Sequence, residues 1–341
     1  MSLLDASNLS FVTKRSEKDR EQEKARLAII FDRYKDRLTM LPKEKDWVFE
    51  NLYMYQGFWY MSNDLVSVQT LIALQETFEA RPTDIYVVTL PKCGTTWIKA
   101  LVFAIVNRNR YKNNSNSTHP LLMANPHNCV PFIETEFYKN KPTYVDGYSP
   151  RLFGTHTPYT SLPRSIIDSG CRIVYMCRNP KDVLVSLFHF VNKVRDKSRG
   201  LMTFEEAFEL FRKGAMPYGP YWDHVKGYYD TSLEHPTRVL FLTYEGLKTE
   251  TADHVKRLAM FLGYPFTEEE EAQGSAEEIV RLCSFENLKE VDKHGSFQGV
   301  PNEAFFREGK VGDWANHLNN DMNNILDQIT RDKFHGLDIS F

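Results

Sequence analysis

The sequence predicts an α/β fold, a single domain with a central parallel sheet flanked by helices. Short apolar runs rich in β-branched residues recur along the 341 residues, and each is followed by a polar turn and then by helical spacing of apolar side chains. The chain shows neither an internal repeat nor a long low-complexity linker, which favours one domain over several.

The first part of the chain, residues 1–45, is expected to be a polar extension, partly helical or disordered, ahead of a domain at 46–341. Residues 14–26 are almost wholly polar with alternating charge sign, a pattern typical of a solvated helix or a frayed end. The next stretch, 47–60, is rich in aromatic side chains, and we expect it to pack in the core or along a ligand pocket.

Strands are expected at 85–90 (IYVVTL), 172–177 (RIVYMC) and 239–243 (VLFLT), with a shorter one near 151–154 (RLFG). Each run is short and apolar, as buried parallel strands are. Ligands of open α/β sheets bind beyond the carboxyl ends of the strands. We therefore expect a functional site built from the residues that follow these runs.

The composition argues against several classes of function. A formal net charge of −3 and a pI near 6.4 provide no bulk attraction to nucleic acid or to an anionic membrane, so neither partner is expected. Five cysteines without CxxC spacing or pairing with histidine fit reduced thiols, and no disulfide framework or metal site is expected. The longest apolar segment, 98–106, is too short to span a bilayer, which predicts a cytoplasmic protein.

The segment after the first sheet strand, PKCGTT, has the features of an anion site. A loop that leaves a strand and opens a helix presents unpaired backbone N–H groups at the positive end of the helix dipole. Gly94 lets an oxyanion approach the backbone, Lys92 supplies a charge, and Thr95 and Thr96 supply hydroxyl donors. The lysine precedes the single glycine, unlike the GxxxxGK[ST] spacing of nucleoside triphosphatases. A tight turn with a capping pair is the alternative interpretation of this motif alone.

Three motifs occur in order along the chain: PKCGTTW at 91–97, RNPKDVLVSLFHF at 178–190 and FREGKVGDW at 306–314. Together they resemble the cytosolic sulfotransferase family, and the spacing between them is similar to that of the plant flavonol and steroid-type members. The resemblance covers nearly the whole domain. It implies a P-loop-like phosphate-binding loop and a donor, 3′-phosphoadenosine 5′-phosphosulfate, whose sulfuryl group is transferred to a hydroxyl of a small molecule.

The resemblance also implies which residues hold the donor. Arg178 and Ser186 match positions that bind the 3′-phosphate, and Arg307 and Gly309 match a segment that closes over it. Many relatives have lysine in place of Glu308. The full donor site implied in this way comprises Lys92, Cys93, Gly94, Thr95, Thr96, Trp97, Arg178, Ser186, Tyr244, Cys283, Ser284, Phe285, Arg307, Glu308 and Gly309.

His156, in RLFGTHTPY, matches the catalytic histidine of the family. A neutral imidazole can take a proton from an acceptor hydroxyl near neutral pH. Lys92 would neutralise the leaving 5′-phosphate as the S–O bond breaks. Two residues before the histidine, animal members commonly have a second lysine, whereas this chain has Gly154.

The resemblance places aromatic residues near the acceptor, which favours a flat or apolar hydroxylated scaffold such as a flavonoid, a phenol, a steroid-like compound or a related plant metabolite. The acceptor-side candidates are Trp59, Tyr60, Phe132, His156, Tyr159 and Phe190. Animal relatives pair through a short motif, where this chain has Ala315, Asn319, Asn320 and Asn324 instead. We therefore expect a monomer, or a dimer that uses another surface.

Two other functions stay open on the sequence. A magnesium-dependent nucleotide kinase could use a similar strand-to-helix loop, and a preference for ATP over the bisphosphate nucleotide would support it. A non-catalytic small-molecule binder on the same scaffold is also possible, because a fold does not fix an activity.

Overall fold

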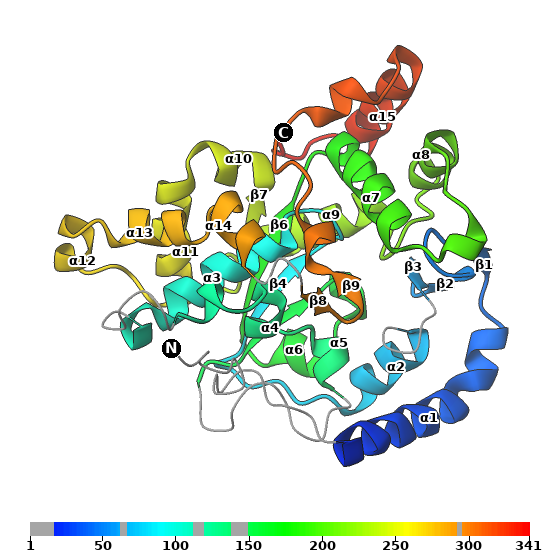
Figure 1. The fold of residues 1–341 in the computed structure, drawn as a ribbon, viewed down its shortest axis with the longest axis horizontal. Helices are drawn as coiled ribbons and strands as arrows, with labels where there is room; N and C mark the ends of the chain where they lie inside the picture. Colours follow the sequence, from blue (N-terminus) through cyan, green and yellow to red (C-terminus); the bar gives the residue numbers. More distant parts are fainter. Residues whose placement is uncertain (1–16, 62–66, 112–118, 138–148, 292–294) are drawn as a thin grey trace, which may run out of the picture.

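The computed structural model describes residues 17–61, 67–111, 119–137, 149–291 and 295–341 (Figure 1). Residues 1–16 of the expected N-terminal extension lie outside the described residues.

A central sheet of four parallel strands confirms the predicted fold class. Its strands are β4 (Ile85–Thr89), β5 (Leu152–Thr155), β6 (Arg172–Cys177) and β7 (Val239–Thr243), arranged in the order β5-β4-β6-β7. Two of the predicted strands match their bounds, the first ends one residue earlier than predicted, and the short one is shifted by one residue. All five residues of β4 are buried, as expected for a strand covered on both faces.

Alternate residues of the central strands pack into two separate cores. On β4, Tyr86 and Val88 belong to one core, and Ile85 and Val87 belong to the other. Helices pack against both faces of the sheet. Those between residues 68 and 282 are α2 (Val68–Thr77), α3 (Thr95–Tyr111), α4 (Pro126–Cys129), α5 (Ile133–Glu136), α6 (Arg164–Asp168), α7 (Pro180–Val194), α8 (Phe204–Arg212), α9 (Tyr221–Glu234), α10 (Tyr244–Thr249), α11 (Thr251–Leu262), α12 (Glu268–Ala272) and α13 (Ser275–Leu282), with short 3₁₀ turns η2 (Pro120–Leu122), η3 (Tyr159–Ser161) and η4 (Lys197–Arg199). The first core includes residues of α2 and α6–α9, and the second includes residues of α3, α10, α11 and α13 (Figure 1).

The N-terminal part of the described chain packs beside α2. Helix α1 (Glu17–Thr39) places Tyr34 in the core, where its hydroxyl donates a hydrogen bond to Glu76. A small antiparallel sheet follows, made of β1 (Lys43–Lys45), β2 (Asn51–Tyr55) and β3 (Phe58–Met61). Trp47 is fully buried and donates a hydrogen bond to the Ala215 carbonyl at 2.7 Å. The aromatic stretch therefore contributes to the core.

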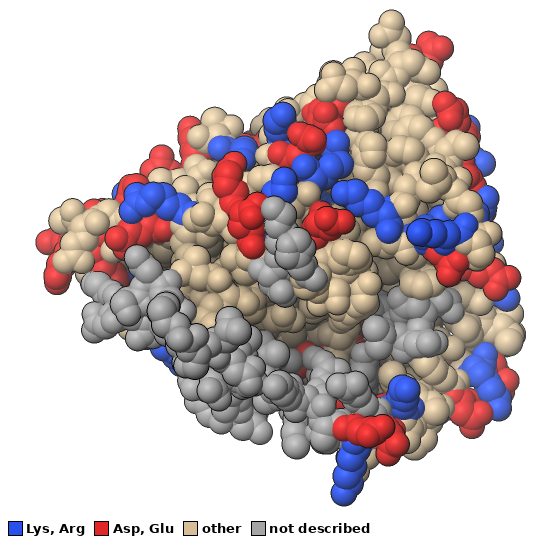
Figure 2. Space-filling model, in the orientation of Figure 1, with Lys and Arg blue, Asp and Glu red and all other residues tan. Residues whose placement is uncertain are grey.

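The C-terminal part crosses beside α7 before it ends in a helix (Figure 1). It consists of α14 (Phe285–Glu290), β8 (Ser296–Phe297), β9 (Val300–Pro301), η5 (Asn302–Phe305), η6 (Asp313–Asn316) and α15 (Asn320–Lys333). Lys and Arg are interspersed with Asp and Glu over the face shown in Figure 2, in keeping with the small net charge.

Candidate functional site

The four parallel strands end at the same edge of the sheet, and the residues that follow them line one cavity of about 710 Å³. Lys92 follows β4, His156 follows β5, Arg178 follows β6 and Tyr244 follows β7. The sequence placed candidate residues after each of these strands, and the structure brings those residues together because parallel strands share their carboxyl edge.

The loop after β4 turns sharply into helix α3. Lys92 and Gly94 both adopt left-handed backbone conformations, with φ of 69° and 85°. A Cβ at Gly94 would lie 2.7 Å from Met176 Cε and 2.8 Å from Tyr244 Cδ2, so only glycine fits there. The backbone N–H groups of Trp97 and Ile98 bond back to the Gly94 carbonyl at 3.0 and 3.1 Å. This tight turn presents the start of α3 to the cavity.

The Lys92 side chain lies at the centre of a group of cations. Its ammonium nitrogen is 4.2 Å from the centroid of the Phe190 ring. Burial lowers the pKa of Lys92 to about 7, and the charges of Arg178, Lys193 and Arg307 act in the same direction. A cluster of like charges in one cavity is costly without a ligand, and a polyanion would relieve the repulsion.

Arg178 connects the loop after β4 to the C-terminal segment. Its Nη1 donates to the Lys92 carbonyl at 3.4 Å and its Nη2 donates to the Lys310 carbonyl at 2.7 Å. The guanidinium also lies 4.6 Å from the centroid of the Tyr244 ring and 3.6 Å from Asp182. Within the described residues, its buried Nε has no hydrogen-bond partner. The guanidinium therefore has hydrogen-bonding capacity that the described residues do not use.

Helix α7 begins at the Arg178 motif because Asn179 accepts a hydrogen bond from the Lys181 backbone N–H and Pro180 occupies the first turn. Ser186 lies one turn further along the same helix, is 7% exposed and lines the cavity. The helix thus brings a hydroxyl and its own N-terminus to the side of the cavity where Arg178 lies.

The C-terminal segment is fixed against α7. The Asp182 carboxylate accepts hydrogen bonds from the backbone N–H groups of Gly312 and Trp314, at 2.8 and 3.0 Å. Gly309 has a φ of 63°, and a Cβ on it would lie 2.6 Å from the Phe285 ring. The Gly309 carbonyl also accepts a hydrogen bond from the Tyr244 hydroxyl at 3.1 Å.

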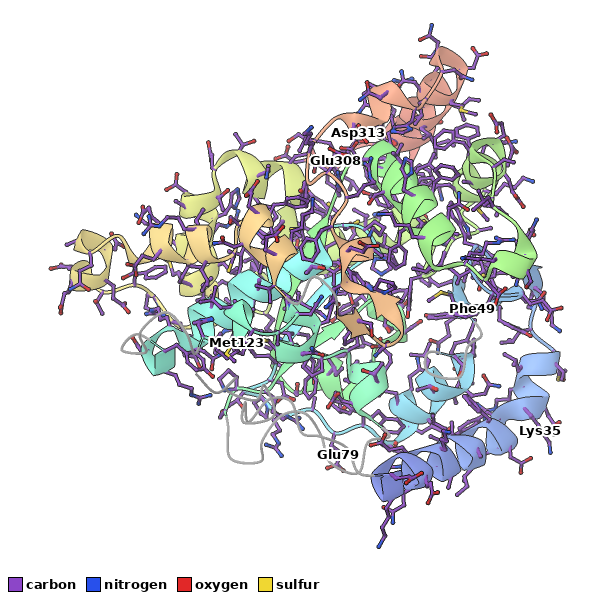
Figure 3. All side chains as sticks on the ribbon, viewed as in Figure 1. Lys35, Phe49, Glu79, Met123, Glu308 and Asp313 are labelled. Carbon is purple, nitrogen blue, oxygen red and sulfur yellow. The ribbon has the colours of Figure 1, made fainter. Side chains whose placement is uncertain are left out.

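Charged residues of this segment differ in their surroundings. Arg307 pairs with Asp313 at 2.6 Å and lines the cavity, and its Nε has no partner in the described part of the chain. Glu308 also lines the cavity, but its half-exposed carboxylate pairs with Lys310 at 3.4 Å. In Figure 3, Glu308 and Asp313 lie on the same C-terminal segment, and Phe49, another residue of the lining, lies apart from them.

Aromatic rings form the wall between Arg178 and α3. Trp97 and Tyr244 meet edge to face, with centroids 5.4 Å apart, and Phe285 and Ser284 line the same region. The side chains of Cys93 and Cys283 are fully buried and are not part of the cavity lining, so their predicted role as donor contacts is not supported for the side chains. Sequence reasoning missed Lys248 and Thr251, which also line the cavity.

His156 has a fixed orientation and a lowered pKa. Its Nδ1 donates to the Thr89 carbonyl at 2.6 Å, which leaves the lone pair on Nε2. The ring lies between Phe132 and Tyr218, at centroid distances of 4.9 and 5.2 Å. Burial lowers the pKa of His156 to about 3, since the hydrogen bond to Thr89 only partly offsets the loss of solvation. The imidazole is therefore neutral, with an acceptor nitrogen available.

The predicted acceptor-side residues are only partly brought together. Phe132, His156 and Phe190 line the cavity, whereas Trp59, Tyr60 and Tyr159, also expected near the acceptor, lie outside its lining. Tyr60 is 3% exposed and packs on Tyr218, which separates it from His156. The backbone of Trp59 pairs with that of Tyr218 and Gly219, while Tyr159 packs on Tyr228. Val48, Phe49, Met61, Pro217 and Phe297 lie in the lining instead.

Three buried titratable residues near His156 were also missed. Glu134 lines the cavity and accepts hydrogen bonds from the Thr155 and Thr157 hydroxyls. His127 lines the cavity as well, and Lys99 lies behind it, 0% exposed. Lys99 is a charge inside the apolar segment 98–106, and that interruption is the sequence signal that could have revealed it.

No group of His, Cys, Asp and Glu side chains suited to a metal ion occurs among the described residues. The described helices also include none that is long and apolar enough to cross a bilayer. The five cysteines are free and buried in the structure.

Comparisons with known proteins agree on a family. The family model of the sulfotransferase domain matches residues 82–338. The chain is 42% identical to cytosolic sulfotransferase 5 of Arabidopsis thaliana over 322 residues, covering 93% of this chain and 98% of that protein. The crystal structure of an Arabidopsis thaliana protein assigned as a steroid sulphotransferase superposes with a TM-score of 0.71 and 37% identity, covering 97% of this chain and 99% of the other. A mouse sulfotransferase complexed with PAP superposes with a TM-score of 0.63 and 27% identity, covering 84% of this chain and 95% of the other.

Proposed function

The chain belongs to the sulfotransferase family, and from that premise we propose that His156 is the general base and Lys92 the electrophilic group of sulfuryl transfer. The protein is a sulfotransferase that uses 3′-phosphoadenosine 5′-phosphosulfate and acts on a small-molecule acceptor.

One observation carries the proposal, namely the hydrogen bond between Arg178 and the Lys92 carbonyl. It means that the two candidate anion sites, after β4 and after β6, are adjacent and open into one cavity. Such a pair of sites suits a nucleotide with phosphates at both its 5′ and 3′ positions. Had the two sites faced different sides of the sheet, one nucleotide could not occupy both.

The donor is proposed to lie across the two strand-to-helix loops. The loop 92–96 would hold the 5′-phosphosulfate, and Arg178, Ser186 and Arg307 would hold the 3′-phosphate. Trp97, Tyr244 and Phe285 would enclose the adenine, because flat rings pack well against a purine. The mouse relative solved with PAP, adenosine 3′,5′-bisphosphate, supports a donor of this kind.

The proposed step is an in-line displacement at sulfur. His156 Nε2 takes the proton of the acceptor hydroxyl while that oxygen forms a new bond to sulfur. The bond between sulfur and the bridging phosphate oxygen breaks, and the electron pair stays on that oxygen. The Lys92 ammonium neutralises the charge that develops there. The products are a sulfate ester and adenosine 3′,5′-bisphosphate.

The acceptor end of the cavity supports a flat or apolar hydroxylated scaffold, such as a flavonoid, a phenol or a steroid-like compound. It is lined by Phe49, Phe132, Phe190 and Phe297, with His156 among them. We propose that the protein acts as a monomer in the cytosol, which the names of the Arabidopsis relatives support for the compartment. Light scattering that shows a stable dimer would contradict the monomer.

A panel of hydroxylated plant metabolites, incubated with isotopically labelled donor and analysed by mass spectrometry, tests the function. A labelled sulfate ester of at least one flat hydroxylated compound is expected. An acceptor that binds without any sulfated product would favour the non-catalytic binder. Tighter binding of ATP than of adenosine 3′,5′-bisphosphate would favour the kinase.

The role of His156 is tested by His156→Ala. We expect turnover to fall by about 10²–10⁴-fold, the usual contribution of a general base, while the affinity for adenosine 3′,5′-bisphosphate stays within about twofold of the original. His235→Ala removes an exposed histidine at the end of α9 and is the matched control. Near-normal turnover of the His156 variant would exclude it as the base.

A further inference from the structure

Lys99 is a buried amine that the proposed mechanism does not use. It lies in the first part of α3, is 0% exposed, and makes no ion pair within the described part of the chain. Its nitrogen is 3.2 Å from the centroid of the Phe132 ring and 3.2 Å from His127 Nδ1. Burial holds the pKa of Lys99 well below its ordinary value, and Glu134 opposes that shift. A buried amine without an ion pair is costly, which calls for a compensating role.

A chain of polar contacts runs from Lys99 to the loop that would hold the donor. His127 Nδ1 faces Lys99, and His127 Nε2 is 3.2 Å from Thr96 Oγ1. The rings of Phe132, Phe297 and Phe305 surround the imidazole at centroid distances of 5.3, 5.0 and 5.0 Å, which fixes its orientation. Lys99 is not in the cavity lining, but Thr96 is. The hydrogen-bonded route from Lys99 to the cavity therefore runs through His127.

The chemistry of Lys99, His127 and Thr96 determines which atom donates in each of the two hydrogen bonds. The Phe132 ring, 3.2 Å from the Lys99 nitrogen, favours the ammonium form of this amine. An ammonium group can only donate, so this form requires the lone pair of His127 to be on Nδ1. Nε2 then carries the hydrogen and donates it to Thr96 Oγ1. The Thr96 hydroxyl makes no second hydrogen bond among the described residues, so its own hydrogen is free for the cavity. With Lys99 replaced by an apolar residue, the imidazole could take the other tautomer, and Thr96 would turn its hydrogen inward.

We propose that Lys99 is a positioning residue for the anionic donor: through His127, it keeps the hydrogen of the Thr96 hydroxyl directed into the cavity. The inference rests on the proposed function, because it assumes that an anion is bound by the loop after β4. Two further titratable groups act on His127, namely His156 and Lys92, and neither is hydrogen-bonded to its imidazole.

Gly154 supplies an independent way to disturb the same amine. A Cβ at this position would lie 2.2 Å from Lys99 Cε and 2.4 Å from Lys99 Nζ. Glycine at 154 is therefore explained by the space that the lysine side chain occupies. Gly154 is not part of the cavity lining, so a methyl group there would displace Lys99 without touching the ligand directly.

A double-mutant cycle measured by isothermal titration calorimetry with adenosine 3′,5′-bisphosphate tests the proposal. Lys99→Met is expected to weaken binding about tenfold in the native background, the scale of a lost hydrogen bond to a charged group. In a Thr96→Val background, which lacks the hydroxyl, the same change is expected to alter affinity by less than about twofold. Equal losses in both backgrounds, or no loss in either, would overturn the proposal.

Lys181→Met is the matched control, because Lys181 is a buried lysine of α7 whose amine bonds to Asp327 and Asn323 instead. Its effect is expected to be additive with Thr96→Val. If Lys99→Met does not fold, Gly154→Ala replaces it in the cycle, with the same expected coupling and the same overturning result. Native protein that does not bind the nucleotide at all would refute the proposed function itself, whereas binding with an additive cycle would refute only this inference.

Discussion

The lowered pKa of Lys92 predicts that nucleotide affinity depends on pH. In the free protein the group titrates near pH 7, because burial and three neighbouring cations disfavour its charge. A bound phosphate would pair with the ammonium group and raise that pKa again. Between these two values the protein must take up a proton when it binds, so affinity falls as pH rises above about 7.

The size of the expected change in nucleotide affinity follows from the pKa of Lys92. With a pKa of about 7, half of the Lys92 side chains are charged at pH 7, and about 1% are charged at pH 9. The affinity for adenosine 3′,5′-bisphosphate should therefore fall about fiftyfold between pH 7 and pH 9, provided that the pKa of Lys92 in the complex lies above 9. Ionisation of the nucleotide contributes little to this pH dependence, because its phosphates are already almost fully ionised above pH 7.

Calorimetric titrations at pH 7, 8 and 9 measure this dependence. The number of protons taken up on binding is obtained by comparing the binding enthalpy in buffers of different ionisation enthalpy. Lys92→Met is the control, and its weaker affinity should be nearly constant over the same range. A native affinity that does not change between pH 7 and pH 9 would refute the reasoning. An equal slope in the Lys92→Met variant would assign the titration to another group.

Three further predictions concern other parts of the structure. Arg178→Lys keeps the charge but not the fork that reaches the Lys92 and Lys310 carbonyls, so calorimetry should show nucleotide affinity reduced about tenfold; unchanged affinity would argue against a bidentate role. Gly94→Ala forces a methyl group against neighbouring side chains at a positive φ, which should cost about 2–4 kcal/mol of stability and lower the melting temperature in thermal denaturation; an unchanged Tm would contradict this. Arg151→Met removes the ion-pair partner of the buried Asp84 carboxylate and leaves it with the hydrogen bonds from the Arg81 N–H and the Tyr86 hydroxyl. Urea denaturation should show a loss of about 3–5 kcal/mol, and a loss below about 1 kcal/mol would mean that those two hydrogen bonds suffice.

The strands of the central sheet could be predicted because burial on both faces produces short, continuous apolar runs. Their bounds differ from the predicted ones by one residue at most. The positions of Lys92, His156, Arg178 and Tyr244 around one cavity followed from the same pattern, since each comes directly after a strand of a parallel sheet.

The acceptor side could not be predicted in the same way. Whether Tyr60 or Met61 faces the cavity depends on how β3 packs against the loop at Tyr218, which is a contact between distant parts of the sequence. Trp59 and Tyr159 were chosen for their aromatic character, but aromatic rings serve equally well in a core. The sequence shows a lysine inside the apolar segment 98–106, but it does not show that His127 is its partner, because their contact joins two helices.

Lys92 has a left-handed backbone, a conformation that glycine would adopt at less cost to the stability of the loop. Stability and activity therefore make opposite demands on this one residue. A glycine would relax the turn, but it would also remove the positive charge that the proposed reaction requires.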